Sequence, residues 1–89
     1  MEVQLFSLLR RLTKTGTVEV QAGTVKEALA ALVERFGPAL AAELFDASGE
    51  VKPLYNLLLN GRNIAYLSGL DTPLAEGDTL TIIPPAAGG

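Results

Sequence analysis

Apolar and polar residues repeat with two different periods along this chain, and the change of period separates predicted strands from predicted helices. Residues 3–9 (Val3 to Leu9) are mostly apolar and predict a first strand. Thr17–Val20 alternates polar and apolar side chains, as a half-buried strand does. Thr15-Gly16 marks a turn between them. The chain is therefore expected to begin with a strand hairpin.

A helical pattern follows after a short connection. From Val25 to Phe36, apolar residues recur at helical spacing and form one stripe. Thr24 and Glu27 have the form of a capping box, in which the Thr24 hydroxyl accepts a hydrogen bond from a free backbone N–H and the Glu27 carboxylate accepts one from the Thr24 amide. Gly37-Pro38 ends this helix. Pro38 is suited to open a shorter helix that runs through Phe45.

The second half of the chain predicts further strands. Residues 46–53 form a polar loop, and residues 56–60 read as a third strand with an apolar run. Asn60-Gly61 is a tight-turn signal, because both residues tolerate positive φ. Residues 63–66 are then expected to form a short return strand.

The last predicted strand, residues 79–84, alternates clearly. Leu80 and Ile82 lie on one face and Ile83 lies on the other. A hairpin, a crossing helix and further strands together predict an α+β fold, in which a mixed sheet carries one main helix on one face. Residues 1–84 are expected to form this domain, and residues 85–89 an extended tail.

Composition narrows the possible functions. The 89 residues suit one small domain, and 48% of them are apolar. The sequence contains no cysteine and no histidine, which excludes disulfides, thiolate metal sites, cysteine nucleophiles and the usual general base. No metal site is therefore expected. The absence of cysteine agrees with an expected cytoplasmic location.

Charge and hydropathy exclude two classes of partner. The net charge is −3, and the one basic cluster, Arg10, Arg11 and Lys14, is read as a solvated loop. Nucleic-acid binding is therefore not expected. No stretch is long and apolar enough to span a bilayer, and the first residues do not resemble a signal peptide. No membrane partner is expected.

The final residues, 84–89, suggest a chemical role for the carboxyl end. Two prolines keep the chain extended. Gly88 and Gly89 lack a Cβ, so they can pass through a narrow channel and leave the carboxyl carbon open to a nucleophile. The alternative interpretation is a frayed end without a function, because termini are often disordered.

Four motifs follow one another in the last thirty residues: Asn60-Gly61-Arg62-Asn63-Ile64, Leu70-Asp71-Thr72-Pro73-Leu74, Glu76-Gly77-Asp78-Thr79-Leu80 and Ile82-Ile83-Pro84-Pro85-Ala86-Ala87-Gly88-Gly89. In this order they resemble the MoaD/ThiS family of ubiquitin-like sulfur carriers. The resemblance is greatest to the MoaD branch, the small subunit of molybdopterin synthase. The loop at residues 46–53 departs from the shortest members and leaves the pathway open.

This resemblance implies a β-grasp fold and a carrier that is not itself an enzyme. An E1-like enzyme of the MoeB/ThiF type would adenylate the Gly89 carboxylate with ATP, and a sulfur donor would convert the adenylate to a thiocarboxylate. The tail would then enter an acceptor enzyme, such as the large subunit of molybdopterin synthase. The sequence has no glycine-rich phosphate loop, so ATP would be used by the partner and no cofactor would be bound here.

A partner surface is predicted beside the tail. Strand alternation places Leu58 and Ile83 on the face opposite the helix, where exposed apolar side chains often mark an interface. Phe6 is a third candidate, although the alternation of its strand is blurred. Partial covering by the loop at residues 46–53 is the alternative. The tail residues complete the predicted interface: Pro84, Pro85, Ala86 and Ala87.

Several functions agree with these features. Molybdopterin synthesis leads among sulfur pathways, followed by tRNA thiolation, thiamine synthesis and cysteine synthesis. A second function is a ubiquitin-like modifier that forms isopeptides through Gly89. A third is an unrelated interaction domain whose diglycine end is incidental. The first two require the same tail and the same activation, so the sequence does not separate them.

Overall fold

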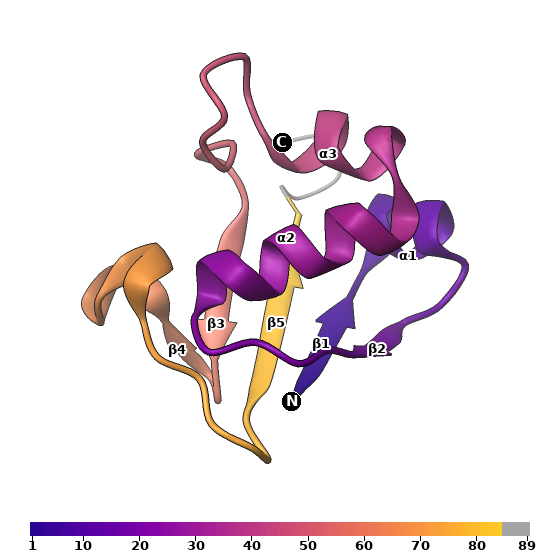
Figure 1. Ribbon diagram of the computed structural model, residues 1–89. Helices are drawn as coiled ribbons and strands as arrows, with labels where there is room; N and C mark the ends of the chain where they lie inside the picture. Colours follow the sequence, from indigo (N-terminus) through magenta and orange to yellow (C-terminus); the bar gives the residue numbers. More distant parts are fainter. Residues whose placement is uncertain (85–89) are drawn as a thin grey trace.

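Five strands form one mixed sheet in the order β2-β1-β5-β3-β4 (Figure 1). The computed structural model describes residues 1–84. The parallel pair is β1 with β5, and the other three pairs are antiparallel, so β5 lies in the middle of the sheet. The strand bounds are Glu2–Leu5 for β1, Thr17–Glu19 for β2, Asn56–Leu59 for β3, Arg62–Asn63 for β4 and Thr79–Ile83 for β5.

The main helix, α2 (Val25–Phe36), crosses the sheet and supplies much of the core. The Thr24 side chain accepts a hydrogen bond from the Glu27 amide at 3.2 Å, as predicted. The second half of the predicted capping box is wrong, because the Glu27 carboxylate accepts from the Gly23 amide at 2.8 Å instead. A Cβ at Gly23 would lie 3.1 Å from the Glu27 carboxylate, so glycine leaves room for this contact.

A shorter helix, α3 (Pro38–Leu44), follows directly and begins with the predicted proline. It ends one residue earlier than predicted, with Phe45 at its C-cap in an extended conformation. The core combines the inward side chains of the sheet with those of the helices. Its ten largest fully buried side chains are Leu5, Leu9, Leu29, Leu32, Leu40, Leu44, Leu80, Ile82, Val3 and Val25.

The predicted first strand is too long. It ends at Leu5, and Ser7–Thr13 form a helix, α1, within what was predicted as strand and hairpin turn. Leu9 and Thr13, four residues apart, are both buried, so the apolar run follows a helical period beyond Phe6. The β1–β2 pair is antiparallel, as a hairpin requires, but a helix rather than a tight turn connects it.

Two left-handed residues bound α1. Ser7 has φ of 52° and Lys14 has φ of 61°. These conformations let the chain turn sharply into and out of the helix. The basic cluster therefore lies on α1 and its C-cap rather than in the predicted solvated loop.

The predicted return strand is also too long. Asn60 and Gly61 adopt φ of 52° and 87°, which confirms the tight turn, but β4 ends at Asn63. Ile64–Tyr66 form a 3-10 turn, η1, because the Asn63 side chain accepts from the Ala65 amide at 2.9 Å and begins a helical turn there.

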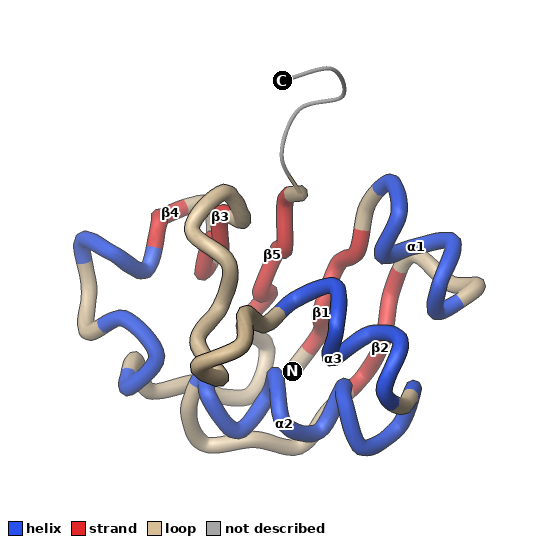
Figure 2. Tube along the Cα trace, turned by 90° about the horizontal axis from the view of Figure 1, so that it is seen from above, coloured by secondary structure: helices blue, strands red, loops and turns tan. Residues whose placement is uncertain are grey.

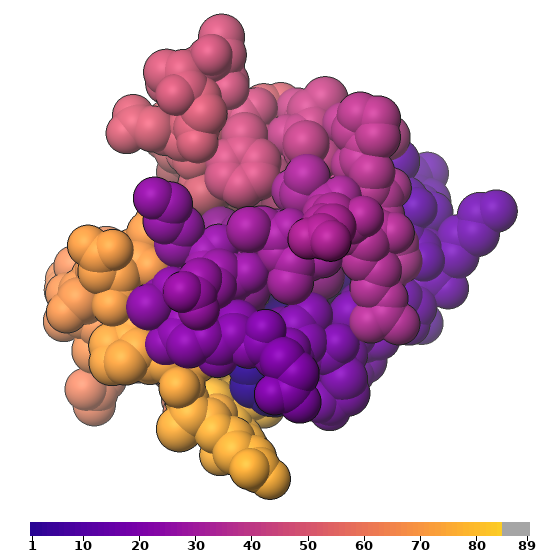
Figure 3. Space-filling view, in the orientation of Figure 1, coloured from indigo at the N-terminus to yellow at the C-terminus, as the bar shows by residue number. Residues whose placement is uncertain are grey.

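The helices cover one face of the sheet. Figure 2 shows α2 and α3 on one side of the strands, with α1 beside β2 and η1 beside β4. A second 3-10 turn, η2 (Gly69–Asp71), follows η1. We call the opposite sheet surface the open face. Figure 3 shows the helix-covered face, from which the loop before β3 stands out at the top. No helix within residues 1–84 is long and apolar enough to cross a membrane.

Candidate partner-docking site

The central strand, β5, carries the chain toward its carboxyl-terminal residues. Parallel pairing with β1 places Ile82 opposite Leu5, and antiparallel pairing with β3 places Ile83 opposite Asn56. Because β5 is hydrogen-bonded along both edges, the position at which the chain leaves the sheet is fixed by two neighbours. Pro84 is half-buried at this point.

The predicted reactive end lies outside the described residues. The structure therefore does not test the extended tail or the roles predicted for its members, which are Pro85, Ala86, Ala87, Gly88 and Gly89. These remain predictions. What the structure does show is the surface beside which this segment begins.

Three of the predicted interface residues come together on the open face. Phe6 continues β1 with extended backbone angles, so it follows Leu5 to the opposite face and lies next to Ile83. Phe6 is 43% exposed and Ile83 is 38% exposed. Leu58 is half-buried and pairs with Thr81, two residues before Ile83. We call Phe6, Leu58 and Ile83 the apolar patch. Their role as an interface stays a prediction.

Leu54 is an exposed apolar residue that sequence reasoning missed. It is 67% exposed and lies two residues before Asn56, the residue that pairs with Ile83. It occupies a turn closed by the Tyr55 amide, which donates to the Lys52 carbonyl at 3.0 Å. The available signal was an apolar residue directly after Pro53 in an otherwise polar loop.

A buried tyrosine anchors this segment to α3. The Tyr55 hydroxyl donates a hydrogen bond to the Glu43 carboxylate at 2.8 Å. Burial of the phenol, together with this bond and the negative charge of Glu43, raises the pKa of Tyr55 above its ordinary value. The hydroxyl therefore stays protonated and keeps its role as donor.

The opposite end of β5 is fixed by polar contacts rather than by apolar ones. The Asn60 amide group donates to Asp78 Oδ1 at 3.0 Å, and the Ala75 amide donates to Asp78 Oδ2 at 2.7 Å. These two hydrogen bonds hold the pKa of Asp78 below its ordinary value. Asp78 thus accepts hydrogen bonds from a side-chain amide and from a backbone amide of the turn. Within residues 1–84, no group of three acidic side chains could hold a metal ion.

The fold and the chain exit together define a class of protein. A mixed sheet crossed by one main helix, with the central last strand leading out beside an exposed apolar patch, is a ubiquitin-like β-grasp domain. The sequence model of the ThiS family matches residues 3–89, and the chain belongs to this family of ubiquitin-like sulfur carriers.

Known proteins agree with this assignment. Small archaeal modifier protein 3 of Haloferax volcanii is 34% identical over 100% of this chain and 98% of its own length. The crystal structure of SAMP1 from the same organism has a TM-score of 0.87 at 37% identity, covering 99% of this chain and 97% of that one. A chain in the crystal structure of the Amycolatopsis orientalis BexX/CysO complex has a TM-score of 0.84 at 28% identity, covering 99% of this chain and 98% of that one.

These relatives confirm the predicted β-grasp fold and the prediction that the chain is a carrier or modifier rather than an enzyme. They do not select the molybdopterin pathway, and the assignment to the MoaD branch remains a prediction.

Proposed function

We propose that this protein carries sulfur on the carboxyl group of Gly89. The observation that supports this most is that the family match extends through residue 89, together with a fold in which the central strand β5 is the last described element. An adenylating enzyme of the E1-like type activates the carboxylate. An acceptor enzyme then receives the sulfur.

The chemistry requires two displacements. A Gly89 carboxylate oxygen attacks the α-phosphorus of ATP, and pyrophosphate leaves. Hydrosulfide, or sulfur from a donor enzyme, then attacks the acyl carbon, and AMP leaves with the electrons of the cleaved C–O bond. The product is a thiocarboxylate. Gly88 and Gly89 present no Cβ that would obstruct approach to the carbon.

The carrier depends on partners for both steps. Its sequence offers no phosphate loop, histidine or cysteine, so ATP binding and sulfur delivery come from other proteins. The apolar patch beside the exit of β5 is the surface on which those partners dock. Burying the exposed parts of Phe6 and Ile83 removes apolar area from water, which favours association.

The pathway has several candidates. The likeness to CysO supports cysteine synthesis, and the likeness to small archaeal modifier proteins supports isopeptide formation with lysines. Molybdopterin synthesis remains the prediction drawn from the sequence, with tRNA thiolation and thiamine synthesis behind it. All five use the same activated Gly89.

The test is activation by the adenylating enzyme encoded in the same genome. The full-length chain is incubated with that enzyme, ATP and sulfide, and its intact mass is measured. We expect the mass to rise by the difference between sulfur and oxygen. Lysine-linked conjugates without this shift would support the modifier function instead. No AMP release with any adenylating enzyme of the organism would contradict both.

Gly89→Ala is expected to impair thiocarboxylate formation and transfer without altering the fold. The added methyl group lies beside the reacting carbon, where small displacements reduce rates strongly. Thermal unfolding provides the control for folding. Formation and transfer at the wild-type rate would contradict the proposed role of this residue.

A further inference from the structure

A hollow on the open face adjoins the apolar patch. It has a volume of about 360 Å³ and is open to solvent. Phe6 forms part of its wall, so the hollow and the patch are one continuous surface. Six residues line it, from β1, α1 and the entry of β2: Gln4, Leu5, Phe6, Arg10, Gly16 and Thr17.

The Arg10 side chain packs closely against Gly16, and both residues line this hollow. A Cβ built on Gly16 would lie 3.3 Å from Arg10 Nε and 3.5 Å from its Cζ. Alanine at this position would therefore require the Arg10 side chain to shift by a few tenths of an ångström. Gly16 has no positive φ that would require glycine, so the space left for Arg10 is the consequence that the structure shows.

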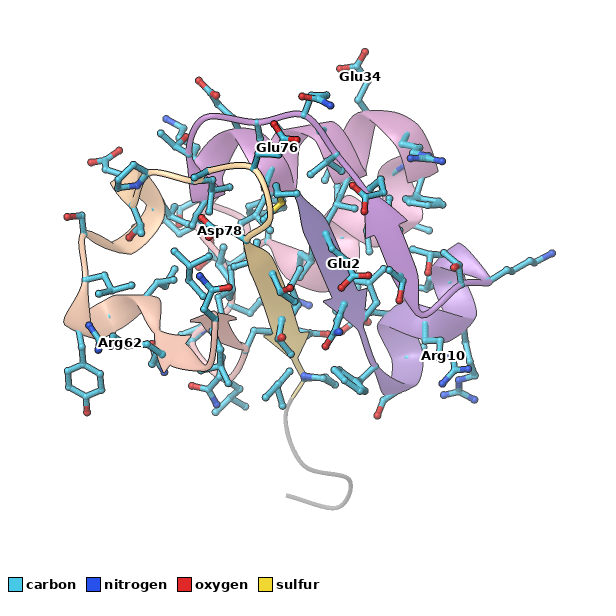
Figure 4. The ribbon with its side chains drawn as sticks, turned by 90° about the horizontal axis from the view of Figure 1, so that it is seen from below. Glu2, Arg10, Glu34, Arg62, Glu76 and Asp78 are labelled. Carbon is cyan, nitrogen blue, oxygen red and sulfur yellow. The ribbon has the colours of Figure 1, made fainter. Side chains whose placement is uncertain are left out.

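The guanidinium has no acidic partner within residues 1–84. The one ion pair there joins the amino group of Met1 to Glu19, and Arg10 forms hydrogen bonds through its backbone: its amide donates to the Phe6 carbonyl, and its carbonyl accepts from the Thr13 hydroxyl. Figure 4 shows Arg10 on α1, well apart from the labelled Glu34 of α2. A cation with five donors is thus held beside an exposed aromatic ring.

We propose that Arg10 is a specificity-determining docking residue. It pairs with a carboxylate of the activating enzyme, presented next to the apolar side chain that contacts Phe6. The volume of the hollow is sufficient for such a side chain, and Gln4 and Thr17 add polar groups to its lining. This inference rests on the proposed function, because it assumes activation by an adenylating enzyme.

Charge complementarity identifies the partner group as acidic. The chain as a whole is negative, yet the only ionised side chain that lines this hollow is a cation. Planar guanidinium and carboxylate groups form paired hydrogen bonds, which fix orientation as well as add affinity. Such a pair would set the rotation of the carrier on the enzyme, so that the end of β5 points toward the active site.

Arg11 provides a matched control. It lies in the same last turn of α1, so it shares any favourable interaction with the helix C-terminus. It does not line the hollow. A role of Arg10 in helix stability alone therefore predicts equal effects at the two positions, whereas docking predicts an effect at Arg10 only.

The experiment measures AMP formation by the adenylating enzyme as a function of carrier concentration. For Arg10→Glu we expect KM to rise at least about tenfold, with kcat near the wild-type value. Arg11→Glu should keep the wild-type KM. Gly16→Ala should raise KM by less, because it displaces the guanidinium without removing it. Added salt should raise KM for the wild type more than for Arg10→Glu.

Equal KM values for Arg10→Glu and Arg11→Glu would overturn the inference. Thermal unfolding of both variants controls for folding, and both positions are exposed. Wild-type activity separates this failure from failure of the proposed function, since a wild type that yields no AMP contradicts the function itself. Replacing the responsible enzyme carboxylate by lysine should restore activation of Arg10→Glu.

Discussion

Single side chains fix the turns around β5, and for one of them, Asp78, we expect the contribution to stability to depend on pH. Its hydrogen bonds from Asn60 and Ala75 lower its pKa in the folded state. A depressed pKa means that the carboxylate stabilises the fold above its unfolded-state pKa, and that this contribution disappears as pH falls through the folded-state value.

We therefore expect Asp78→Asn to lower the free energy of unfolding at neutral pH. The difference from the wild type should shrink as pH falls below about 4. Urea unfolding at a series of pH values measures this. Asp71→Asn is the control, because the Asp71 carboxylate forms no hydrogen bond within the described residues. A difference that is independent of pH would contradict the argument.

Among the elements, α1 depends most on unusual backbone conformations. Lys14, its C-cap, has φ of 61° and ψ of 21°. This left-handed conformation is unfavourable for residues with a Cβ, and glycine adopts it readily. Lys14→Gly should raise the free energy of unfolding by about 0.5–1 kcal/mol. Lys14→Ala retains the strained conformation and should not, as urea unfolding of both variants would show.

The same element shows why part of the fold could not be predicted from the sequence. The stripe of α2 and the Asn60-Gly61 turn depend on neighbours along the chain, and both predictions were confirmed. The run from Val3 to Leu9 is mostly apolar, so either a strand or a helix could bury part of it. Only contact with the rest of the core decides that it changes conformation at Phe6.

The residues of the candidate site also fall into two groups: those that the sequence pattern predicted and those that it did not. Alternation within β5 and β3 predicted Ile83 and Leu58, and the structure places both on the open face. Arg10 was missed as a neighbour of this patch, because it belongs to a helix that was predicted as strand and loop, and the exposed Leu54 was missed because it lies in a loop. The alternation of side chains along a strand cannot identify residues that lie in a loop or a helix.

At the scale of the whole molecule, stability and docking reside on opposite sides of the sheet. Leu32 of α2 is fully buried, whereas Phe6 on the open face is 43% exposed. Leu32→Ala should cost about 2–5 kcal/mol of unfolding free energy. Phe6→Ser should change stability by less than about 1 kcal/mol but weaken binding to the adenylating enzyme.

Leu12→Ser is the matched control for the binding measurement. Leu12 is 37% exposed on α1 and lies outside the apolar patch. Titration calorimetry with the adenylating enzyme compares the two variants. If Leu12→Ser weakens binding as much as Phe6→Ser does, general surface hydrophobicity rather than the patch carries the interaction.

The parallel pairing of the first and last strands also has a mechanical consequence. β1 and β5 share four register pairs and run side by side, so traction on the carboxyl end against the amino end would slide one strand along the other. Under such a shear load, the hydrogen bonds between β1 and β5 must break together rather than one after another. Pulling by a partner on the chain beyond β5 is therefore resisted by all the hydrogen bonds of the β1–β5 pair at once.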